Sequence, residues 1–192
     1  MSHYFIMMAE PGPGGPVARR TSAWAHMLTR GEPLEIDPGL FEFVIEEEPR
    51  SPPTAPGPLL DWYEPDKGHS LFSGRMREVL AGAGVDNVQY FPARVSSAVS
   101  GLSLDHQVAN IIGCVDLLDL ERSDLVVDED DFVEEIFGMV FDEARAEGRR
   151  LFRLGEFESL VIVRSDVRDA IERAGLTGMC FLRDVDYEPG MI

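Results

Sequence analysis

One pattern occurs twice in the chain and constrains its fold more than any other: an amphipathic helix that stops at a glycine and leads into a strand. The two copies, EVLAGAGVDNVQYFP (residues 78–92) and DAIERAGLTGMCFLR (residues 169–183), align with a shift of 91 residues. Ahead of each glycine, apolar residues recur at the i, i+3, i+4, i+7 spacing of one helix face. They are Met76, Val79, Leu80 and Ala83 in the first copy, and Val167, Ala170, Ile171 and Ala174 in the second.

Gly84 and Gly175 stand directly after these helices. A glycine at this place favours a left-handed C-terminal cap, and the apolar residue behind it, Val85 or Leu176, can pack back on the last turn as in a Schellman motif. A phosphate-binding loop needs the reverse order, with glycines after a strand and before a helix, so that helix N–H groups face the phosphate. The glycines are therefore predicted to be helix caps, and we expect no nucleotide cofactor.

Strand-like runs flank both helices, and a serine near each helix start, Ser73 or Ser165, can act as the N-cap. The sequence thus predicts an α+β fold, a mixed β-sheet with flanking helices, that contains two similar strand-helix-strand units at about residues 71–91 and 162–182. Their likeness fits an old duplication or the shared local pattern of such units, and the residues leave both explanations open.

Other elements follow from composition and periodicity. We expect strands at residues 4–8, 41–45, 150–154 and 159–163, a loop at 96–105, and a buried strand from Val108 with a bulge at Gly113. The first part of FVEEIFGMVFDEARAEG (residues 132–148) leaves helix and strand both open.

The 192 residues, 44% of them apolar, are enough for one domain with its own core. We expect residues 1–192 to form that single domain, with at most a small N-terminal lobe at residues 1–45. The best candidate boundary is EEEPRSPPTAPGP (residues 46–58), because a proline-rich run forms a stiff, exposed connection.

The charge is strongly one-sided, with 35 acidic against 17 basic side chains and a net charge of −18. Such a field repels nucleic-acid backbones and anionic membrane surfaces, and it favours a basic partner. Half of the net charge lies in residues 116–135, the acidic segment, where ten acids stand against Arg122 alone. The acidic segment is either a solvated loop that keeps the chain soluble or a docking surface for a basic protein. Its candidate partner-binding residues are Asp116, Asp119, Glu121, Asp124, Asp128, Glu129, Asp130, Asp131, Glu134 and Glu135.

Patterns of catalytic or metal-binding residues are absent from the sequence. No nucleophile elbow accompanies Ser103, Asp105 and His106, which would otherwise suggest parts of a triad. The run DEDD (residues 128–131) lacks the glycine and the distal glutamate of a calcium loop. The histidines are spread singly, without the pairing of a metalloenzyme, at His3, His26, His69 and His106. We therefore expect no catalytic residue, no metal and no cofactor.

The cysteines and the apolar runs bear on the compartment. Cys114 and Cys180 lie in apolar runs that favour buried, free thiols, as in a reducing compartment. YFIMMA (residues 4–9) is too short for a signal peptide, and no apolar run is long enough to span a membrane. We therefore expect a cytoplasmic protein.

Three stretches carry a resemblance to a known family: LFSGRMREVLAGAGVDNVQYFP, VANIIGCVDLLDLERSD and LFRLGEFESLVIVRSDVRDAIERAGLTGMCF. In their order and spacing they resemble a bacterial immunity-protein family of polymorphic toxin systems, number eleven of the usual series. The similarity runs from about Asp61 to Val185. It rests on Arg77 and residues 83–87, on Asn110, Gly113, Asp116, Asp119 and Ser123, and on Phe152, Arg153, Ser165, Ala174, Gly175 and Gly178.

The resemblance implies a stoichiometric inhibitor, encoded beside a toxin, that protects the producing cell by binding that toxin. An inhibitor that stays in the cytoplasm meets toxins whose targets lie there, such as nucleic acid, nucleotides or translation components. Many such toxins are basic, which would give the acidic segment its role. Two other classes stay open: an enzyme or small-molecule binder with a pocket between the two strand-helix-strand units, and an oligomeric structural protein.

Overall fold

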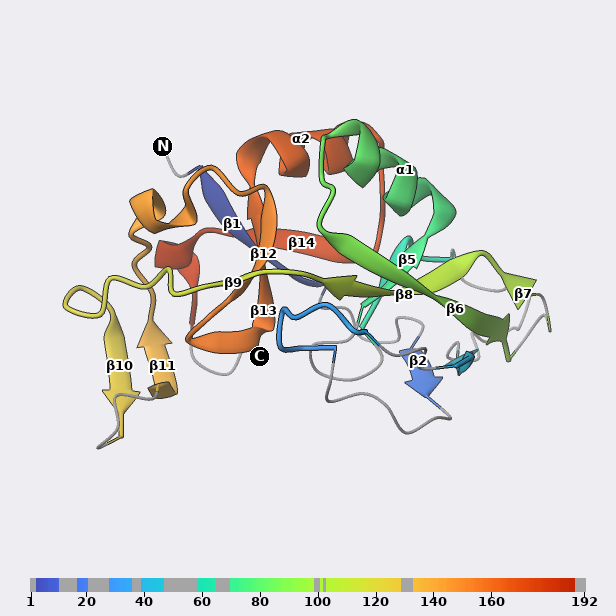
Figure 1. The fold of residues 1–192 in the computed structure, drawn as a ribbon, viewed down its shortest axis with the longest axis horizontal. Helices are drawn as coiled ribbons and strands as arrows, with labels where there is room; N and C mark the ends of the chain where they lie inside the picture. Colours follow the sequence, from blue (N-terminus) through green and yellow to red (C-terminus); the bar gives the residue numbers. More distant parts are fainter. Residues whose placement is uncertain are drawn as a thin grey trace, which may run out of the picture.

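The computed structural model describes residues 3–10, 17–20, 28–35, 39–46, 59–64, 70–98, 101, 103–128 and 133–188. Within this part of the chain the strands form three sheets, and two helices, α1 (Gly74–Gly82) and α2 (Ser165–Arg173), lie next to each other (Figure 1). The described structure is rich in sheet with two helices, which agrees with the α+β class of mixed sheets predicted from the sequence.

The first sheet combines strands from distant parts of the sequence. Its five strands are ordered β14 (Met179–Leu182), β1 (Tyr4–Ala9), β13 (Phe157–Arg164), β12 (Leu151–Leu154) and β9 (Cys114–Val115). Neighbouring strands are antiparallel except β9, which runs parallel to β12. The early strand β1 is therefore held between two strands that come much later in the chain.

The second sheet is larger. Its order is β2 (Val17–Arg20), β3 (Phe41–Glu46), β6 (Val88–Ser97), β8 (His106–Ile111), β5 (Ser70–Ser73) and β4 (Trp62–Tyr63), with β7 (Ser103–Leu104) paired to β6. Strands β3 and β6 are parallel, and the other pairs are antiparallel. Both large sheets are thus mixed.

The third sheet is a hairpin of two antiparallel strands, β10 (Asp124–Val127) and β11 (Val133–Gly138). It stands at one end of the molecule (Figure 1). The stretch that the sequence left undecided between helix and strand therefore contains a strand. Two short 3-10 helices complete the described elements: η2 (Glu143–Ala146) and η3 (Asp184–Asp186).

Central strands of the first sheet are apolar on both faces because each face covers its own core. In β13, Val161 and Val163 pack with α1 and α2 in a first buried cluster, whereas Leu160 and Ile162 point into a second. Strand β1 divides in the same way, as expected from the two-residue period of a strand. The first cluster also includes side chains of β4, β5 and β8, so it joins the two large sheets.

Both predicted helix caps are confirmed. Gly84 is left-handed, with φ 76°, and its N–H donates to the Ala81 carbonyl at 3.0 Å, while the N–H of Val85 donates to the Leu80 carbonyl at 3.0 Å. These are the two hydrogen bonds of a Schellman motif. The end of α2 has the same pair, from Gly175 to Glu172 and from Leu176 to Ile171. The helices stand in the chain orders β5-α1-β6 and β13-α2-β14, but the similarity of the two units as wholes stays a prediction.

The helix starts differ from each other. Ser73 is the N-cap of α1, as predicted, and its hydroxyl accepts a hydrogen bond from the Met76 N–H at 3.1 Å. The same prediction is wrong for Ser165, which lies inside α2. There Arg164 is the N-cap, and its side chain makes no capping bond but binds Asp166, the second residue of the helix.

The bulge predicted at Gly113 is wrong, because the chain changes sheets there. Strand β8 ends at Ile111, and β9 of the first sheet begins at Cys114. Gly113 has φ 108°, and its N–H donates to the Gly31 carbonyl at 2.7 Å. A side chain at Gly31 would begin only 3.0 Å from the Gly113 backbone, so the close approach requires glycine. The predicted loop at 96–105 is also shorter, since β6 and β7 take up part of it.

The early part of the chain is shared between the two large sheets. Strand β1 pairs with β13 and β14, and β3 pairs with β6. Residues 47–58, most of the proline-rich connection, lie outside the described residues. The single domain with a small lobe at residues 1–45 therefore stays a prediction.

Candidate functional site

The acidic segment runs from the end of β9 into β11. Five of its candidate residues have exposed side chains: Asp116, Glu121, Asp124, Glu134 and Glu135. Asp119 and Asp128 are half-buried, and Glu129, Asp130 and Asp131 lie outside the described residues. The structure therefore brings a group of solvent-facing acids onto the β10–β11 hairpin and the turn before it.

Exposed apolar side chains gather on the same part of the chain. The described residues expose seven large apolar side chains, and four of them lie here: Leu120 (50% exposed), Val126 (39%), Val127 (45%) and Phe137 (42%). Single exposed apolar residues are ordinary, but a group of them is typical of a contact site. We call these four, together with Glu121, Asp124, Glu134 and Glu135, the hairpin surface. Sequence reasoning found its acids through their number, but it missed its apolar residues, which look like core residues in the sequence.

The inner side of the hairpin is anchored to the body. Leu125 pairs with the buried Ile136, and both belong to the second cluster. At the hairpin base, the Ser123 hydroxyl accepts from the Val140 N–H at 3.0 Å and donates to the Val140 carbonyl at 3.3 Å. The outer side chains can therefore be changed without disturbing the packing beneath them.

Glu156, in the turn between β12 and β13, holds the chain that leads into the hairpin. Its carboxylate accepts hydrogen bonds from the N–H groups of Leu117 at 3.1 Å and Leu118 at 2.8 Å. Burial raises the pKa of this carboxyl, although the backbone hydrogen bonds lower it. Asp119 serves the following turn, where its carboxylate lies 3.7 Å from Arg122 and accepts from the Arg122 N–H. Among the ten candidate acids, Asp119 thus has a structural role within the chain.

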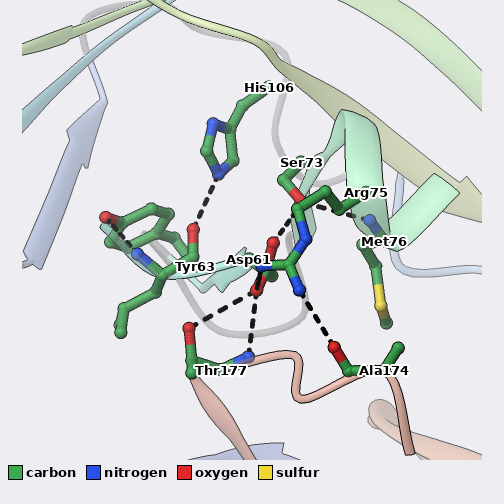
Figure 2. A network of polar contacts seen from close by, with 9 residues as sticks. Asp61, Tyr63, Ser73, Arg75, Met76, His106, Ala174 and Thr177 are labelled. Carbon is green, nitrogen blue, oxygen red and sulfur yellow. Dashed lines mark hydrogen bonds and ion pairs between the residues drawn. The ribbon is translucent and has the colours of Figure 1, made fainter. Parts of the chain in front are cut away.

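A second polar site is buried and centres on Asp61, which is 5% exposed (Figure 2). One carboxylate oxygen accepts from the Ser73 hydroxyl at 2.7 Å, and the other from the Thr177 N–H at 3.1 Å. Arg75 lies 3.3 Å from the second oxygen and also donates to the Ala174 carbonyl at 2.9 Å. The carboxylate thus ties the start of α1 to the loop after α2. Sequence reasoning missed this role, because nothing in the stretch around Asp61 points to partners so far along the chain.

His106 lies beside this network, with its Nε2 at 2.9 Å from the Leu60 carbonyl (Figure 2). Its Nδ1 is buried without a hydrogen-bond partner, and burial lowers the pKa of the imidazole. Asp105 pairs instead with Arg77 at 2.8 Å, and Ser103 is exposed. The three residues are therefore not assembled as a triad, and the imidazole is a structural group bound to the backbone.

Acidification is expected to weaken the fold through His106. The pKa of the folded state lies below the unfolded value of about 6.5, so the unfolded chain binds this proton first. The neutral ring therefore stabilises the fold in full when the pH is above the unfolded pKa. This stabilisation is lost as the pH falls toward the folded pKa. Asp61 and Asp105 oppose the shift, and Arg77 adds to it.

The measurement is the free energy of unfolding at pH 7 and pH 5, for wild type and His106→Gln. The loss of stability between the two pH values should be smaller in the variant, because the remaining carboxylates titrate equally in both proteins. An identical loss in both would contradict the prediction.

Two depressions on the surface are lined by charged groups that already have partners within the chain: an ion pair in one, and an arginine bound to a backbone carbonyl in the other. One of about 430 Å³ lies at the start of α2, where Arg164 binds Asp166 through two hydrogen bonds of 2.7 Å. The paired guanidinium lowers the pKa of Asp166 to about 2. The other, of about 160 Å³, lies beside Gly84, where Arg150 donates to the Gly84 carbonyl. Neither is lined by residues of both predicted strand-helix-strand units, so neither supports a ligand pocket between them.

The thiols and other possible metal ligands are scattered in the described part of the chain. No group of three or more histidine, cysteine or acidic side chains within it could hold a metal ion. Both cysteines are free, but the prediction that they are buried is wrong: Cys114 is exposed and Cys180 is half-buried. Cys114 is exposed because β9 is a short strand at the edge of its sheet.

The sequence matches a known protein family. The family model described as "Immunity protein family (Imm11)" matches residues 17–186, which is most of the chain. No curated protein matches. The helices in the described residues are also too short to cross a membrane.

Proposed function

Because the chain belongs to the Imm11 immunity protein family, we propose that it binds and neutralises a cognate bacterial toxin in the cytoplasm, without catalysis. An immunity family implies a toxin partner in general and a role that is not catalytic. The observation that supports a specific binding site is the hairpin surface, because exposed apolar side chains and exposed acids occur on the same hairpin and the turn before it. The toxin is expected to be basic and to be encoded by a neighbouring gene.

The hairpin surface has the composition of a protein-protein interface. Such interfaces have an apolar, often aromatic centre and a polar rim. Here Phe137, Val126 and Val127 can supply the centre, while the surrounding carboxylates supply the rim. Complementary charge contributes mainly to the association rate and to partner choice, whereas burial of the apolar centre slows dissociation.

The test is co-expression of the chain with the product of the neighbouring gene. We expect the two proteins to purify together and the chain to restore growth to cells that express the toxin. An equimolar mixture of the two purified proteins is also expected to lack toxin activity. Failure to purify together, combined with unrelieved toxicity, would contradict the proposed function.

Neutralising four acids of the hairpin surface is expected to slow toxin binding. The variant replaces Glu121, Asp124, Glu134 and Glu135 with Gln or Asn, all of them exposed and without an ion pair in the described structure. The association rate at low salt should fall by about tenfold or more, since steering charges raise such rates by 10 to 1000 times. The melting temperature should change little, because solvated charges contribute little to folding.

A matched control variant removes the same charge elsewhere. It neutralises four other exposed acids, Glu35, Glu78, Asp86 and Glu188. Association rates are measured at low and high salt for wild type and both variants. If both variants slow association equally, the net charge alone matters, and the hairpin surface has no special part in binding.

A further inference from the structure

The outer edge of β10 has no strand beside it in the described structure. Strand β10 pairs with β11 alone, in a sheet of two strands. In Figure 1, β10 is the outermost strand at its end of the molecule, and β11 lies between it and the body. Along a strand, successive N–H and C=O pairs point alternately to the two sides. Half of the β10 backbone groups therefore point away from β11.

Charge restricts what can pair with this edge. An open edge is a template for any extended chain, and acidic side chains along it prevent pairing with a second acidic copy. The exposed Asp124 begins β10, and the register places the exposed Glu135 opposite Val126. A second copy of this chain, with its net charge of −18, would bring like charges together. A basic segment would instead find opposite charges at the same positions.

The side chains next to the edge are also suited to an added strand. Val126 and Val127 are exposed within β10, and both are β-branched residues that pack well against a neighbouring strand. Val127 faces the opposite side of the strand from Val126, Asp124 and Glu135. Apolar residues of the added strand can therefore cover Val127, while lysine or arginine residues on its other face reach the carboxylates. Main-chain hydrogen bonds supply affinity in this kind of recognition, and alternate side chains supply specificity.

From this geometry we infer that β10 binds its partner by strand addition: an extended segment of the toxin, alternating basic and apolar residues, pairs with the outer edge of β10. This inference rests on the proposed function for the identity of the partner. It adds the mode of binding, which the hairpin surface alone does not specify.

A synthetic peptide tests the edge without the toxin. The probe is a peptide of about six residues that alternates lysine and valine, the usual length of a strand. Added to the whole protein, it should shift the NMR signals of the β10 amides and slow the exchange of those that face outward. A glutamate-valine peptide should do neither. Two N-methylated lysine-valine peptides, one methylated on its odd residues and one on its even residues, should bind β10 with different affinities. Only one of them keeps the N–H groups that face β10.

The outcomes separate the mode of binding from side-chain contact. Equal binding by the two N-methylated peptides, or no change at β10 with the unmethylated one, would overturn strand addition. In the complex with the toxin, the outward-facing β10 amides should be protected from exchange. A stable complex in which they exchange as in the free protein would leave the proposed function intact and overturn the inference. Absence of any complex would instead count against the proposed function.

Discussion

Replacing Gly178 with alanine is expected to lower the free energy of unfolding by about 3 kcal/mol or more. Gly178 has φ 98°, a conformation that residues with a side chain rarely adopt. An added Cβ would lie 2.3 Å from the Trp62 carbonyl oxygen and 2.9 Å from the Leu60 side chain, so the loop after α2 would have to move off Leu60 and the start of β4. Backbone strain and overlap with a rigid backbone atom act together at this position.

Gly175→Ala is the matched control. Gly175 is also left-handed, with φ 63°, but an added Cβ there meets nothing within 4 Å. Gly175→Ala should therefore lower the free energy of unfolding only through backbone strain, by about 1–2 kcal/mol. Denaturant unfolding of wild type and both variants measures the difference. If Gly178→Ala lowers the free energy of unfolding no more than Gly175→Ala does, Gly178 does not pack closely against Trp62.

Asp61→Ala is expected to have the second large effect and to lower the free energy of unfolding by about 3 kcal/mol. The substitution leaves the buried Ser73 hydroxyl and the partly buried Thr177 N–H without their acceptor, and a buried group without its partner costs about 1–3 kcal/mol. The ion pair with Arg75 adds little, because the Arg75 side chain is 62% exposed. The unfolding free energy of the purified variant tests this expectation.

Two further variants separate the contributions at Asp61. Asp61→Asn keeps one acceptor oxygen but turns an N–H donor toward Thr177 or Ser73. It should therefore lower the free energy of unfolding less than Asp61→Ala does and more than Arg75→Ala does. Arg75→Ala should cost about 1 kcal/mol or less. An Arg75→Ala variant as unstable as Asp61→Ala would mean that the ion pair, not the buried hydrogen bonds, holds this junction.

Local features of the fold were predictable from the sequence because neighbouring residues decide them. The helix ends at Gly84 and Gly175 follow from a positive φ that glycine adopts without strain, and the strand at residues 159–163 follows from its apolar run. The division into two large sheets was not predictable. It depends on the crossing at Gly113, whose partner Gly31 lies far away in the sequence.

The candidate site shows the same limit. The acids of residues 116–135 stood out through their number, whereas the exposure of Val126, Val127 and Phe137 depends on which strands come to lie over them. The residue type is the same for an apolar side chain on an uncovered hairpin and for one in the core, so only the tertiary structure distinguishes them. The half-buried Asp119, which serves a turn, could not be separated from its solvated neighbours for the same reason.

The position of β1 between β13 and β14 has a consequence for biosynthesis. Ile6 pairs with both Ile162 and Leu182, so the centre of the first sheet cannot form until residue 182 has left the ribosome. Contacts at such separation are slow to form, and the unpaired apolar strand stays exposed to other nascent chains in the meantime. Under the proposed function, a cell that begins to make this chain and its toxin together would have active inhibitor only after a delay, which favours starting synthesis of the inhibitor first.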